Sequence, residues 1–548
     1  MKDFDSEIYA YSLENAISHN SAQPQFVLSK LFQHGLKKED IKAVMPKIVE
    51  VVNKVNSMSI DQRKLEFEKY SSFIKKKEEN EKTLRDLPNI SKRMIFRIAP
   101  EPSKHLHIGH ALTFIINSLY SEKYHGKLLL RFEDANPEKV TEEFEKSILE
   151  DIKDYLKLKI SGIRYVSDDI PLLYNYAEKL ISLNKAYMCF CSRDKIRSFR
   201  HEGKECECRS FSYDKNMREW EKFILGRYSE GKAVLRIKGD MKSLNHVMRD
   251  SVIFRAVSCS HYRTGNKYKV WPMYDFYNPI EDSLMGVTHI LRSNEFEARI
   301  ELQEQIKNIL NLKGQTIIQY GRFNVQDSTT KGREIREAIK SGEYLSWDDP
   351  RLVTLKSLKR RGIVKEVFVE LAESLGLTKN QVNLDFDMIA AISRKILDKK
   401  ANRYSFVSEP VKLSILNAPN IKSIKVKIHP DKKTFRTVKI GEVYISKEDF
   451  DRFKKKEVRL MHLYNVILDD KSIFTSMENK NIPKINWVSN PVKVRVMMPD
   501  AKYLYGYAEP SIQELKIGEI IQFERFGFCR LDSFDKDKKE FEFWFSHK

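Results

Sequence analysis

Apolar residues follow three different spacings along this chain, and each spacing predicts a different kind of structure. Residues 1–90 show helical spacing, residues 91–185 alternate between strand-like apolar runs and helix-like segments, and apolar residues from about 401 to 548 tend to fall at every second position. We therefore expect a helical region, an α/β region and an all-β region. A chain of 548 residues is long enough for roughly three to four domains.

The first region is predicted to be a separate helical unit. An apolar stripe of isoleucine and valine runs from Ile48 to Val55 after Pro46, a residue that a helix tolerates in its first turn. The charge run Lys75–Lys82 (KKKEENEK) predicts a solvated helix or a linker at the end of this unit. None of these residues indicates a particular chemistry.

The second region has the alternation typical of a nucleotide-binding α/β unit. Met94–Phe96 predicts the end of a buried strand, and Ala111–Leu119 has helix-like apolar spacing after a proline-containing turn. A second strand is predicted at Lys127–Phe132 (KLLLRF). Ligands of such units collect beyond the carboxyl ends of parallel strands, so the residues that follow each strand are candidates for a site.

Short strands recur from about residue 400 to the end. Apolar and polar residues alternate in Ile424–Ile428 and in Val492–Val496. An all-β region of this length suggests barrels. Arginine and lysine among aromatic residues fit recognition of RNA loops by stacking and charge, a signal that is weak by itself.

The charge balance narrows the choice of partners. The chain carries 97 Lys and Arg against 77 Asp and Glu, a net charge of +20, which favours a polyanion such as nucleic acid. A membrane surface would also fit this charge, but no run of 18 apolar residues occurs and the first residues are acidic, unlike a signal peptide. We expect an intracellular, cytoplasmic protein without a membrane partner.

Two histidines mark the strongest candidate for chemistry. His107 and His110 lie at the predicted strand-to-helix junction with Gly109 between them, in RIAPEPSKHLHIGHALT. Both imidazoles would lie near the positive end of the helix dipole, and the glycine would allow a base or a phosphate to approach the backbone. Two histidines at this spacing could instead bind a metal or occupy a helix surface, so the pair alone does not decide.

Four of the six cysteines are grouped in two pairs. Cys189 and Cys191 form one C-x-C pair, Cys206 and Cys208 form the other, and a short basic loop separates them. Four thiolates are the set that a tetrahedral structural zinc takes. Four unrelated buried thiols are the alternative, which the repeated spacing disfavours, and disulfides are rare in cytosolic proteins.

The histidine motif lies within a longer pattern that resembles a known family. The segment R-x-A-P-E-P-x-x-x-L-H-I-G-H-A, the later W-P-M-Y-D-F with G-V-T-H-I-L-R, and W-D-D-P-R-L-x-T-L-x-x-L-x-R-R-G-I are similar to class I aminoacyl-tRNA synthetases for glutamate and glutamine. The resemblance covers residues 91–548 and is nearest to archaeal-type glutamyl-tRNA synthetases, which also carry an N-terminal helical extension.

The resemblance implies an order of domains. We expect an N-terminal helical extension (1–90), a Rossmann-type α/β catalytic domain in two halves (91–185 and 266–330), an acceptor-stem-binding insertion with the zinc site (186–265), a helical stem-contact region (331–400) and C-terminal all-β barrels that bind the anticodon (401–548). A monomer is the default in this family.

The resemblance also implies which residues form the site. The ATP-binding motif would comprise Pro100, Leu106, His107, Ile108, Gly109 and His110, with His107 and His110 as catalytic residues around the phosphates. Contacts to the amino acid would come from Arg97, Glu133, Tyr274, Asn278 and Arg292. The segment that contains Glu133 is also a good turn sequence, so its acidic residues need no substrate. Zinc at the four cysteines would be structural.

Arg292 separates the two substrates that the family uses. A γ-carboxylate needs a fixed cation, ideally a guanidinium that grips both oxygens, whereas a γ-amide brings no compensating charge. Glutaminyl enzymes have an uncharged residue at the corresponding place. Arg97 also reaches towards the side chain in this family, so the pocket is expected to take glutamate. A surface helix position for Arg292 is the alternative.

The second ATP-binding loop departs from the family pattern. An ungapped count back from Trp347 places Thr330-Lys331-Gly332-Arg333 where the family has a motif such as M-S-K-R, with glycine at the usual lysine position. That lysine stabilises the triphosphate as charge moves onto pyrophosphate. We expect Lys331 or Arg333 to take this role from a neighbouring position.

The implied function is that of a glutamate–tRNA ligase. It would use ATP and Mg²⁺ to form glutamyl-adenylate from L-glutamate and would then transfer the glutamyl group to tRNA(Glu), or also to tRNA(Gln). A glutaminyl-tRNA synthetase is the nearest rival, which Arg292 opposes. A non-catalytic tRNA-binding paralogue is the other, suggested by the altered loop at 330–333.

Overall fold

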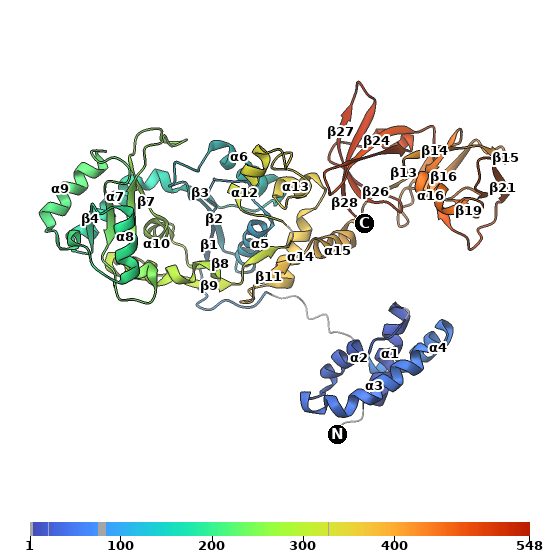
Figure 1. The fold of residues 1–548 in the computed structure, drawn as a ribbon, viewed down its shortest axis with the longest axis horizontal. Coiled ribbons are helices and arrows are strands. Elements are labelled where there is room, and N and C mark those ends of the chain that lie inside the picture. The colour runs from blue at the N-terminus through green and yellow to red at the C-terminus, as the bar shows by residue number, and fades with distance from the viewer. Residues whose placement is uncertain (1–3, 20, 75–83, 327) are drawn as a thin grey trace. The chain divides into compact units, whose positions relative to one another are not determined.

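A computed structural model describes residues 4–19, 21–74, 84–326 and 328–548. The charged run at 75–82 lies outside the described residues. The chain divides into two compact units, Met1–Thr83 and Leu84–Lys548, each with its own core (Figure 1). None of the described helices is both long enough and apolar enough to cross a membrane.

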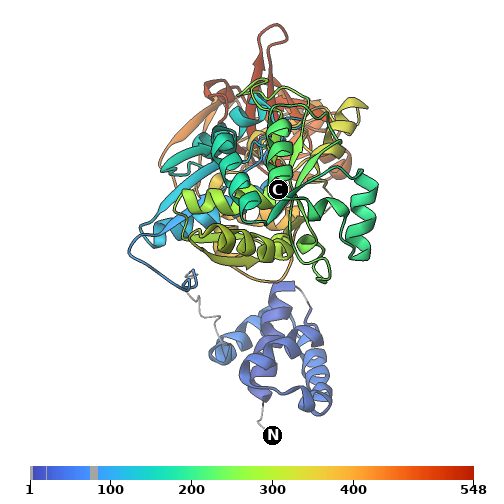
Figure 2. The ribbon, with the colours of Figure 1, turned by 90° about the vertical axis from the view of Figure 1, so that its left-hand side faces the viewer.

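The N-terminal unit is a small helical bundle, as predicted (Figure 2). Its helices are α1 (Asp5–His19), α2 (Pro24–Leu31), α3 (Ile41–Asn56) and α4 (Ile60–Tyr70). The prediction that Pro46 stands in the first turn is wrong, because α3 begins at Ile41 and Pro46 lies inside it. Buried Val44 extends the apolar stripe before the proline, so packing holds the extra turn despite the lost backbone donor.

The α/β region is built on parallel strands. β1 (Ile95–Ile98), β2 (Lys127–Phe132) and β3 (Gly162–Tyr165) pair in this order, and β8 (His289–Ser293) pairs with β9 (Thr316–Tyr320). β8 begins beside β1, because Thr288 N donates to Ile95 O at 2.9 Å. The order outward from β1 therefore reverses between β1 and β8, and such a switch point is where open α/β sheets bind ligands.

Helices connect the strands of this region. They are α5 (Ile108–Lys123), α6 (Glu142–Glu150), α7 (Ile170–Ser182), α10 (Tyr274–Leu284) and α11 (Ile300–Leu310), and a π-helical turn, Asp151–Tyr155, continues α6. α5 has the largest buried face, with Ile108, Leu112, Ile115 and Ile116 in the core under β1 and β2. This packing fixes the N-terminus of α5 at the carboxyl end of β1.

An antiparallel sheet is inserted between the two halves. Its strands are β4 (Ala186–Cys189), β5 (Val234–Ile237), β6 (Val252–Ala256) and β7 (Val270–Pro272), paired in chain order, and α8 (Arg193–Glu202) and α9 (Tyr213–Ile224) accompany them. A second, mainly helical connection follows the catalytic sheet. It comprises β10 (Phe323–Val325) paired with β11 (Val382–Leu384), and α12 (Gly332–Lys340), α13 (Leu355–Arg360), α14 (Lys365–Leu375) and α15 (Phe386–Leu397).

The C-terminal region is all-β apart from the short helix α16 (Lys447–Phe453) and a 3-10 helical turn at Pro510–Glu514. Its largest sheet has seven strands in the order β12-β26-β27-β28-β24-β25-β13, namely Arg403–Tyr404, Ile520–Phe523, Gly527–Asp535, Glu540–His547, Val492–Met497, Tyr503–Ala508 and Phe406–Ser408. The edge strands β12 and β13 are separated in sequence by Ser405 alone, so the two edges lie together and the sheet forms a nearly closed barrel.

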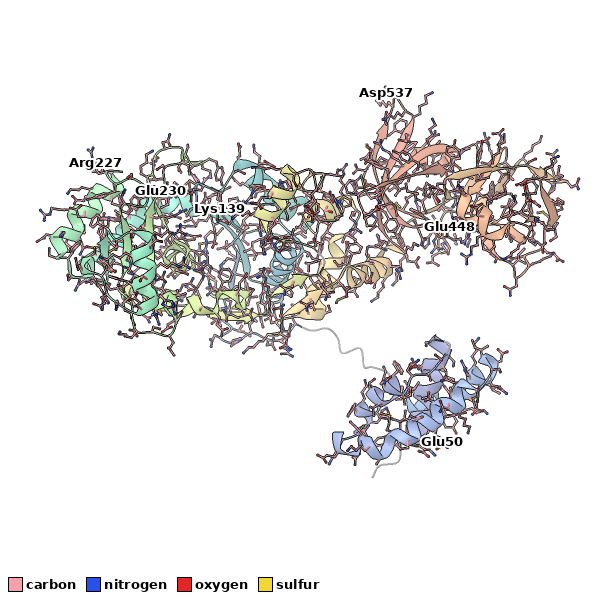
Figure 3. The ribbon with its side chains drawn as sticks, in the orientation of Figure 1. Glu50, Lys139, Arg227, Glu230, Glu448 and Asp537 are labelled. Carbon is pink, nitrogen blue, oxygen red and sulfur yellow. The ribbon has the colours of Figure 1, made fainter. Side chains whose placement is uncertain are left out.

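Smaller sheets complete this region. One is β14-β18-β23 (Pro410–Leu413, Val443–Ser446, Val488–Ser489), and another is β15-β21-β20-β19-β22 (Ile415–Leu416, Ser472–Ser476, Asn465–Ile467, Glu457–Leu460, Lys484–Ile485). β16 (Ser423–Lys427) and β17 (Phe435–Lys439) form a hairpin. Charged side chains such as Glu448 and Asp537 project from the surface (Figure 3). The predicted order of a helical extension, an α/β catalytic region and C-terminal β-barrels is confirmed.

Candidate active site

A cavity of about 390 Å³ opens at the carboxyl ends of β1 and β8, the switch point of the sheet. Six residues predicted from the sequence line it: Arg97, Pro100, His110, Glu133, Tyr274 and Arg292. Tyr274 stands at the start of α10. Asn278 is buried one turn further along α10 and reaches the cavity through its bond to Glu133. The structure thus brings residues from four distant parts of the chain to one place.

The two histidines lie together at one end of this site, where His110 lines the cavity and His107 stands behind it, outside the lining. His107 is the N-cap residue of α5, and its ring centroid lies 3.9 Å from that of His110. Gly109 N donates to His107 Nδ1 at 3.1 Å, and His107 N donates to His110 Nδ1 at 3.2 Å. Each Nδ1 is therefore an acceptor, which leaves the proton of each neutral ring on Nε2. Both rings are hydrogen-bond donors through Nε2.

Burial keeps both imidazoles neutral. Burial, together with the smaller effect of the charge of Lys104, lowers the pKa of His110 to about 3. Burial also lowers the pKa of His107 well below its ordinary value, with His110 and Lys104 adding to the effect. A β-carbon at Gly109 would come within 3.0 Å of His107 Cε1, so glycine is needed here for the His107 ring to fold over the helix end. The pair can donate to phosphate oxygens but brings no positive charge.

A buried charge network forms the opposite wall. Asp282 of α10 accepts from Arg131 Nη1 at 2.6 Å and from Arg97 Nε at 3.1 Å. Arg131 Nη2 donates to Glu133 Oε1 at 3.0 Å, and Asn278 Nδ2 donates to the same oxygen at 3.3 Å. Burial raises the pKa of Glu133, although Arg131 and Arg97 oppose this effect. Glu133 is thus held in a fixed position with its carboxylate at the cavity.

Arg292 lies deep in the cavity at the end of β8. Arg292 is only 4% exposed. Its guanidinium donates to Gln303 Oε1 at 3.0 Å and to Tyr274 Oη at 3.4 Å. None of the ion pairs in the described part of the chain includes Arg292, and its Nε has no hydrogen-bond partner there. Burial accordingly lowers the pKa of Arg292. A buried guanidinium held by neutral groups is a site for an anionic ligand.

The altered second loop lies against the turn that precedes the histidines. Lys331 is the N-cap residue of α12 and pairs with Glu334 at 2.8 Å, while Arg333 pairs with Glu337 at 2.8 Å. Both cations are largely exposed on the surface of this helix. The loop contacts Lys104 instead, whose Nζ donates to Thr330 O at 3.0 Å.

The four free cysteines of the two C-x-C motifs meet beside β4, outside the lining of the cavity at β1 and β8. Their Sγ atoms all lie within 4.8 Å of one another, and Cys189 Sγ is 3.9 Å from Cys206 Sγ. Thiolates around a tetrahedral zinc lie about 3.8 Å apart, given Zn–S bonds of about 2.3 Å. Arg236 Nη1 lies 3.6 Å from Cys206 Sγ, where a positive charge would offset the negative charge of the thiolates. The arrangement fits a structural metal.

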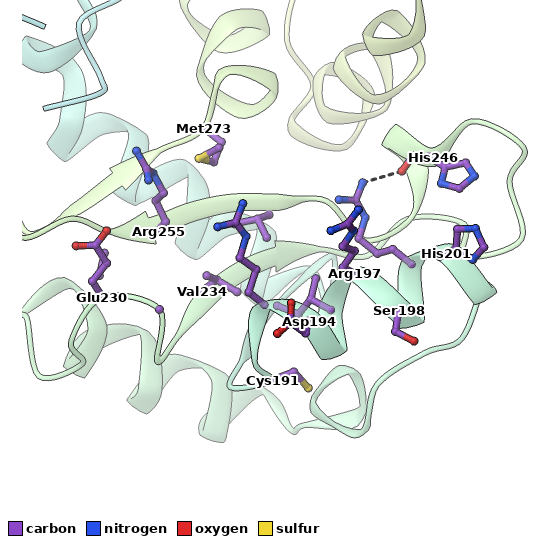
Figure 4. Close-up of a pocket in the computed structure, with 16 residues that line it drawn as sticks. Cys191, Asp194, Arg197, Ser198, His201, Glu230, Val234, His246, Arg255 and Met273 are labelled. Atoms are coloured by element: carbon purple, nitrogen blue, oxygen red, sulfur yellow. Dashed lines mark hydrogen bonds between the residues drawn. The ribbon is translucent and has the colours of Figure 1, made fainter. Parts of the chain in front are cut away.

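A larger cavity of about 1140 Å³ opens between α8 and the inserted sheet (Figure 4). Four arginines line it, against two acidic residues: Arg193, Arg197, Arg200 and Arg255, with Asp194 and Glu230. Arg200 Nη2 donates to His246 O at 2.7 Å, while Arg197 and Arg255 rise into the open space on the side of Met273 (Figure 4). Met273 precedes Tyr274, so the start of α10 separates this basic cavity from the smaller one.

Sequence reasoning missed several residues of the site. Arg131 and Asp282 organise the cavity wall, Gln303 orients Arg292, and Lys104 reaches the second loop. A signal existed for Asp282, because Glu281-Asp282 is an acidic pair in a helix that is otherwise buried on that side. Lys104 stands in the quoted motif itself, but its partner Thr330 is 226 residues away, so nothing local marks it.

Known proteins are similar to this chain over almost its whole length. Residues 93–399 match the catalytic domain of the class I tRNA synthetases described as "E and Q", and residues 401–485 and 473–532 match two anticodon-binding domains of the same group. A glutamate–tRNA ligase of Methanocaldococcus jannaschii is 36% identical over 97% of this chain and 98% of its own length. One of Pyrococcus abyssi is 36% identical over 96% of this chain and 97% of its own.

A solved structure also aligns with the chain. It is a glutamate tRNA ligase from Elizabethkingia meningosepticum, with a TM-score of 0.41 and 17% identity over 56% of this chain and 70% of that chain.

Proposed function

Since this chain belongs to the class I tRNA synthetases for glutamate and glutamine, we propose that it is a glutamate–tRNA ligase that activates glutamate with ATP and transfers it to tRNA. The observation that carries the choice of glutamate is Arg292, a buried guanidinium at the cavity with neutral partners only among the described residues. The γ-carboxylate of glutamate would supply the missing negative charge. The amide of glutamine would leave this cation uncompensated in a buried site.

The proposed reaction needs positioning and charge stabilisation rather than a protein nucleophile. Glu133 would hold the α-amino group, and Arg97 with Arg292 would hold the side chain, so that the α-carboxylate meets the α-phosphate of ATP. His107 and His110 would donate from Nε2 to phosphate oxygens, because both Nδ1 atoms are already acceptors. Mg²⁺ bound with ATP would neutralise part of the phosphate charge. The remaining residues of the motif, Leu106, Ile108 and Gly109, would shape the ATP site.

The second loop would close over the departing pyrophosphate. Lys331 and Arg333 stand at the start of α12, and their present partners Glu334 and Glu337 are exposed residues of the same helix. Solvent screens ion pairs between exposed side chains and makes them weak, so either cation could exchange its carboxylate for phosphate at little cost.

We propose two surfaces for tRNA. The basic cavity of the insertion would bind the phosphates of the acceptor end, since it carries more arginines than acids and adjoins the start of α10. In the C-terminal barrel, Tyr503, Tyr505 and Tyr507 lie on one face of β25, and Arg495 of β24 is the register partner of Tyr505. Tyr505 is 56% exposed, as expected of a residue that stacks on a base in the anticodon loop. The chain would act in the cytoplasm as a monomer.

Aminoacylation with ATP, Mg²⁺ and total tRNA of the source organism tests the function. Labelled glutamate should be attached only when both ATP and tRNA are present. Labelled glutamine should not be attached. Attachment of glutamine alone would show that the cavity has been misinterpreted. If the protein binds tRNA but attaches neither amino acid, it is a tRNA-binding paralogue with a lost activity, consistent with glycine at position 332. Purified tRNA(Glu) and tRNA(Gln) would then define which tRNAs are charged.

We propose that the four cysteines bind one structural Zn²⁺. The purified protein should contain about one zinc per chain by elemental analysis. Cys206→Ser should lose the metal and destabilise the insertion, because closed zinc sites contribute directly to folding. Cys259→Ser, at an exposed cysteine outside the cluster, is the matched control and should keep the metal. A zinc content near zero in the wild type, or an unchanged content in Cys206→Ser, would exclude the site.

A further inference from the structure

The exposed cations of the second loop leave one requirement of the proposed reaction unmet, a cation for the departing pyrophosphate in the sheltered part of the site. The two histidines are neutral donors, and glycine at position 332 takes the place of the lysine that the resemblance implies in the second loop. Charge that moves onto the departing pyrophosphate is best stabilised by a fixed cation in a site sheltered from water. Lys331 and Arg333 are largely exposed and paired within their own helix. A cation closer to the histidines is needed.

Lys104 fills the space that a side chain at position 332 would take. A β-carbon added to Gly332 would come within 3.1 Å of Lys104 Cδ and 3.2 Å of Lys104 Cβ. The side chain of Lys104 therefore crosses the start of α12 where the loop's own lysine would begin. Its ammonium is tied to the loop by the 3.0 Å bond from Nζ to Thr330 O. Arg336 Nη1 donates to Ser103 O at 3.0 Å and joins the same two segments.

The charge of Lys104 acts on the two histidines. It is one of the groups that lower the pKa of both His107 and His110. None of the ion pairs in the described ranges includes Lys104, and burial is the main cause that lowers its own pKa. Glu101 and Glu295 oppose this effect, while Arg322 and Arg336 add to it. A half-buried lysine without a carboxylate partner beside a neutral donor pair is suited to a polyphosphate.

We propose that Lys104 is a catalytic residue that supplies, from the first motif, the cation that the second loop lacks at Gly332. Position 332 is then glycine because Lys104 passes over it. This inference rests on the proposed function and names a residue for one of its steps. In that step an oxygen of the glutamate α-carboxylate forms a bond to the α-phosphorus of ATP. The bond from this phosphorus to the bridging oxygen breaks, and pyrophosphate leaves with the electron pair while Lys104 Nζ donates to its oxygens.

Lys104→Met is the first test, because methionine keeps an apolar stem against Gly332 and removes the charge. ATP–pyrophosphate exchange, with glutamate and tRNA present, should fall by about 10²–10³-fold in kcat, the range seen when one preorganised donor to a developing anion is removed. The dissociation constant for tRNA and the melting temperature should stay unchanged. Lys104→Arg should keep part of the rate. Lys153→Ala, at an exposed lysine of the turn after α6, is the control and should match the wild type.

A charge swap tests the spatial argument. Lys104→Gly should lose the rate as Lys104→Met does, and adding Gly332→Lys to it should restore exchange at least tenfold, because the new side chain enters the space that Lys104 vacated. Gly332→Lys alone should be impaired by contact and repulsion with Lys104. The exchange rate of the double variant would then be higher than the rate expected if the two single effects simply multiplied. Such non-additivity is expected of two residues that share one role.

The outcomes separate this inference from the proposed function. A wild type without glutamate attachment would overturn both. A wild type that attaches glutamate together with an active Lys104→Met, within threefold of it, would overturn the inference alone and show that Lys104 only packs against the loop. The inference is equally overturned if Lys331→Ala or Arg333→Ala abolishes exchange while Lys104→Met does not. Failure of the swap to rescue Lys104→Gly would exclude the shared position.

Discussion

Arg292→Gln is expected to lower kcat/KM for glutamate by about 30- to 5,000-fold, since loss of one partner from a buried charge pair costs about 2–5 kcal/mol. Arg292 is 4% exposed and keeps only neutral partners in the described structure, so a bound γ-carboxylate would be its sole full counter-charge there. Glutamine at this position removes the cation and keeps a polar group next to Tyr274 and Gln303. Steady-state aminoacylation at saturating ATP and tRNA measures the effect, which should fall mainly on KM for glutamate.

Two further variants show whether the loss of activity comes from the charge of Arg292, from the shape of its guanidinium or from an unspecific effect of removing an arginine. Arg292→Lys keeps the charge but loses the planar fork, so its loss should lie between those of the wild type and Arg292→Gln. Arg299→Gln is the matched control, because Arg299 is 41% exposed, pairs with Asp275 and lies outside the cavity lining. It should change kcat/KM by less than threefold. If the Arg292→Gln enzyme is as active as this control, Arg292 has a structural role and does not bind the substrate.

Local pattern predicted most of the elements that carry the site. The strand at Lys127–Phe132 follows from a short apolar run, and the start of α5 at the histidine motif follows from a proline-rich turn before helical spacing. These signals are local, because a strand or helix buries its own apolar face. The start of α3 was missed for the opposite reason, since burial of Val44 in the bundle overrides the expected effect of Pro46.

The contacts within the site were harder to foresee. The resemblance gave Arg97, Glu133 and Arg292, but the acid that holds Arg97 comes from α10, 185 residues further along the chain. The contact between Lys104 and the loop at Thr330 likewise spans 226 residues. Pairings over such separations depend on how β1, α10 and α12 pack together. No periodicity or spacing encodes them, so they became visible only in the folded chain.

Asp282 shows how much the fold itself depends on one of these long-range pairings. Its carboxylate is fully buried and accepts from both Arg97 and Arg131, which are 5% and 0% exposed. Burial alone would raise the pKa of Asp282, but Arg131 and Arg97 outweigh it and hold the pKa below its ordinary value. The charged form is therefore favoured by folding.

Asp282→Asn is expected to lower the free energy of unfolding by about 3–5 kcal/mol at pH 7, the cost of leaving buried charges without their partner. The pKa of Asp282 is lower in the folded than in the unfolded chain, so its stabilisation is fully present above about pH 4 and is lost as the pH falls through the folded value. The difference between wild type and variant should stay constant from pH 5 to pH 8 in urea unfolding followed by tryptophan fluorescence.

The control for this comparison lies on the same helix. Asp275 pairs with Arg299, which is 41% exposed, so Asp275→Asn should cost about 1 kcal/mol or less. A cost for Asp282→Asn no larger than that of the control would mean that the two arginines find other partners and that the network does not hold the cavity wall. A large loss of stability in Asp282→Asn with a normal KM for glutamate would show that Asp282 stabilises the fold without affecting substrate binding. A large cost together with a raised KM would show that Asp282 positions Arg97, and through Arg131 also Glu133, for the substrate.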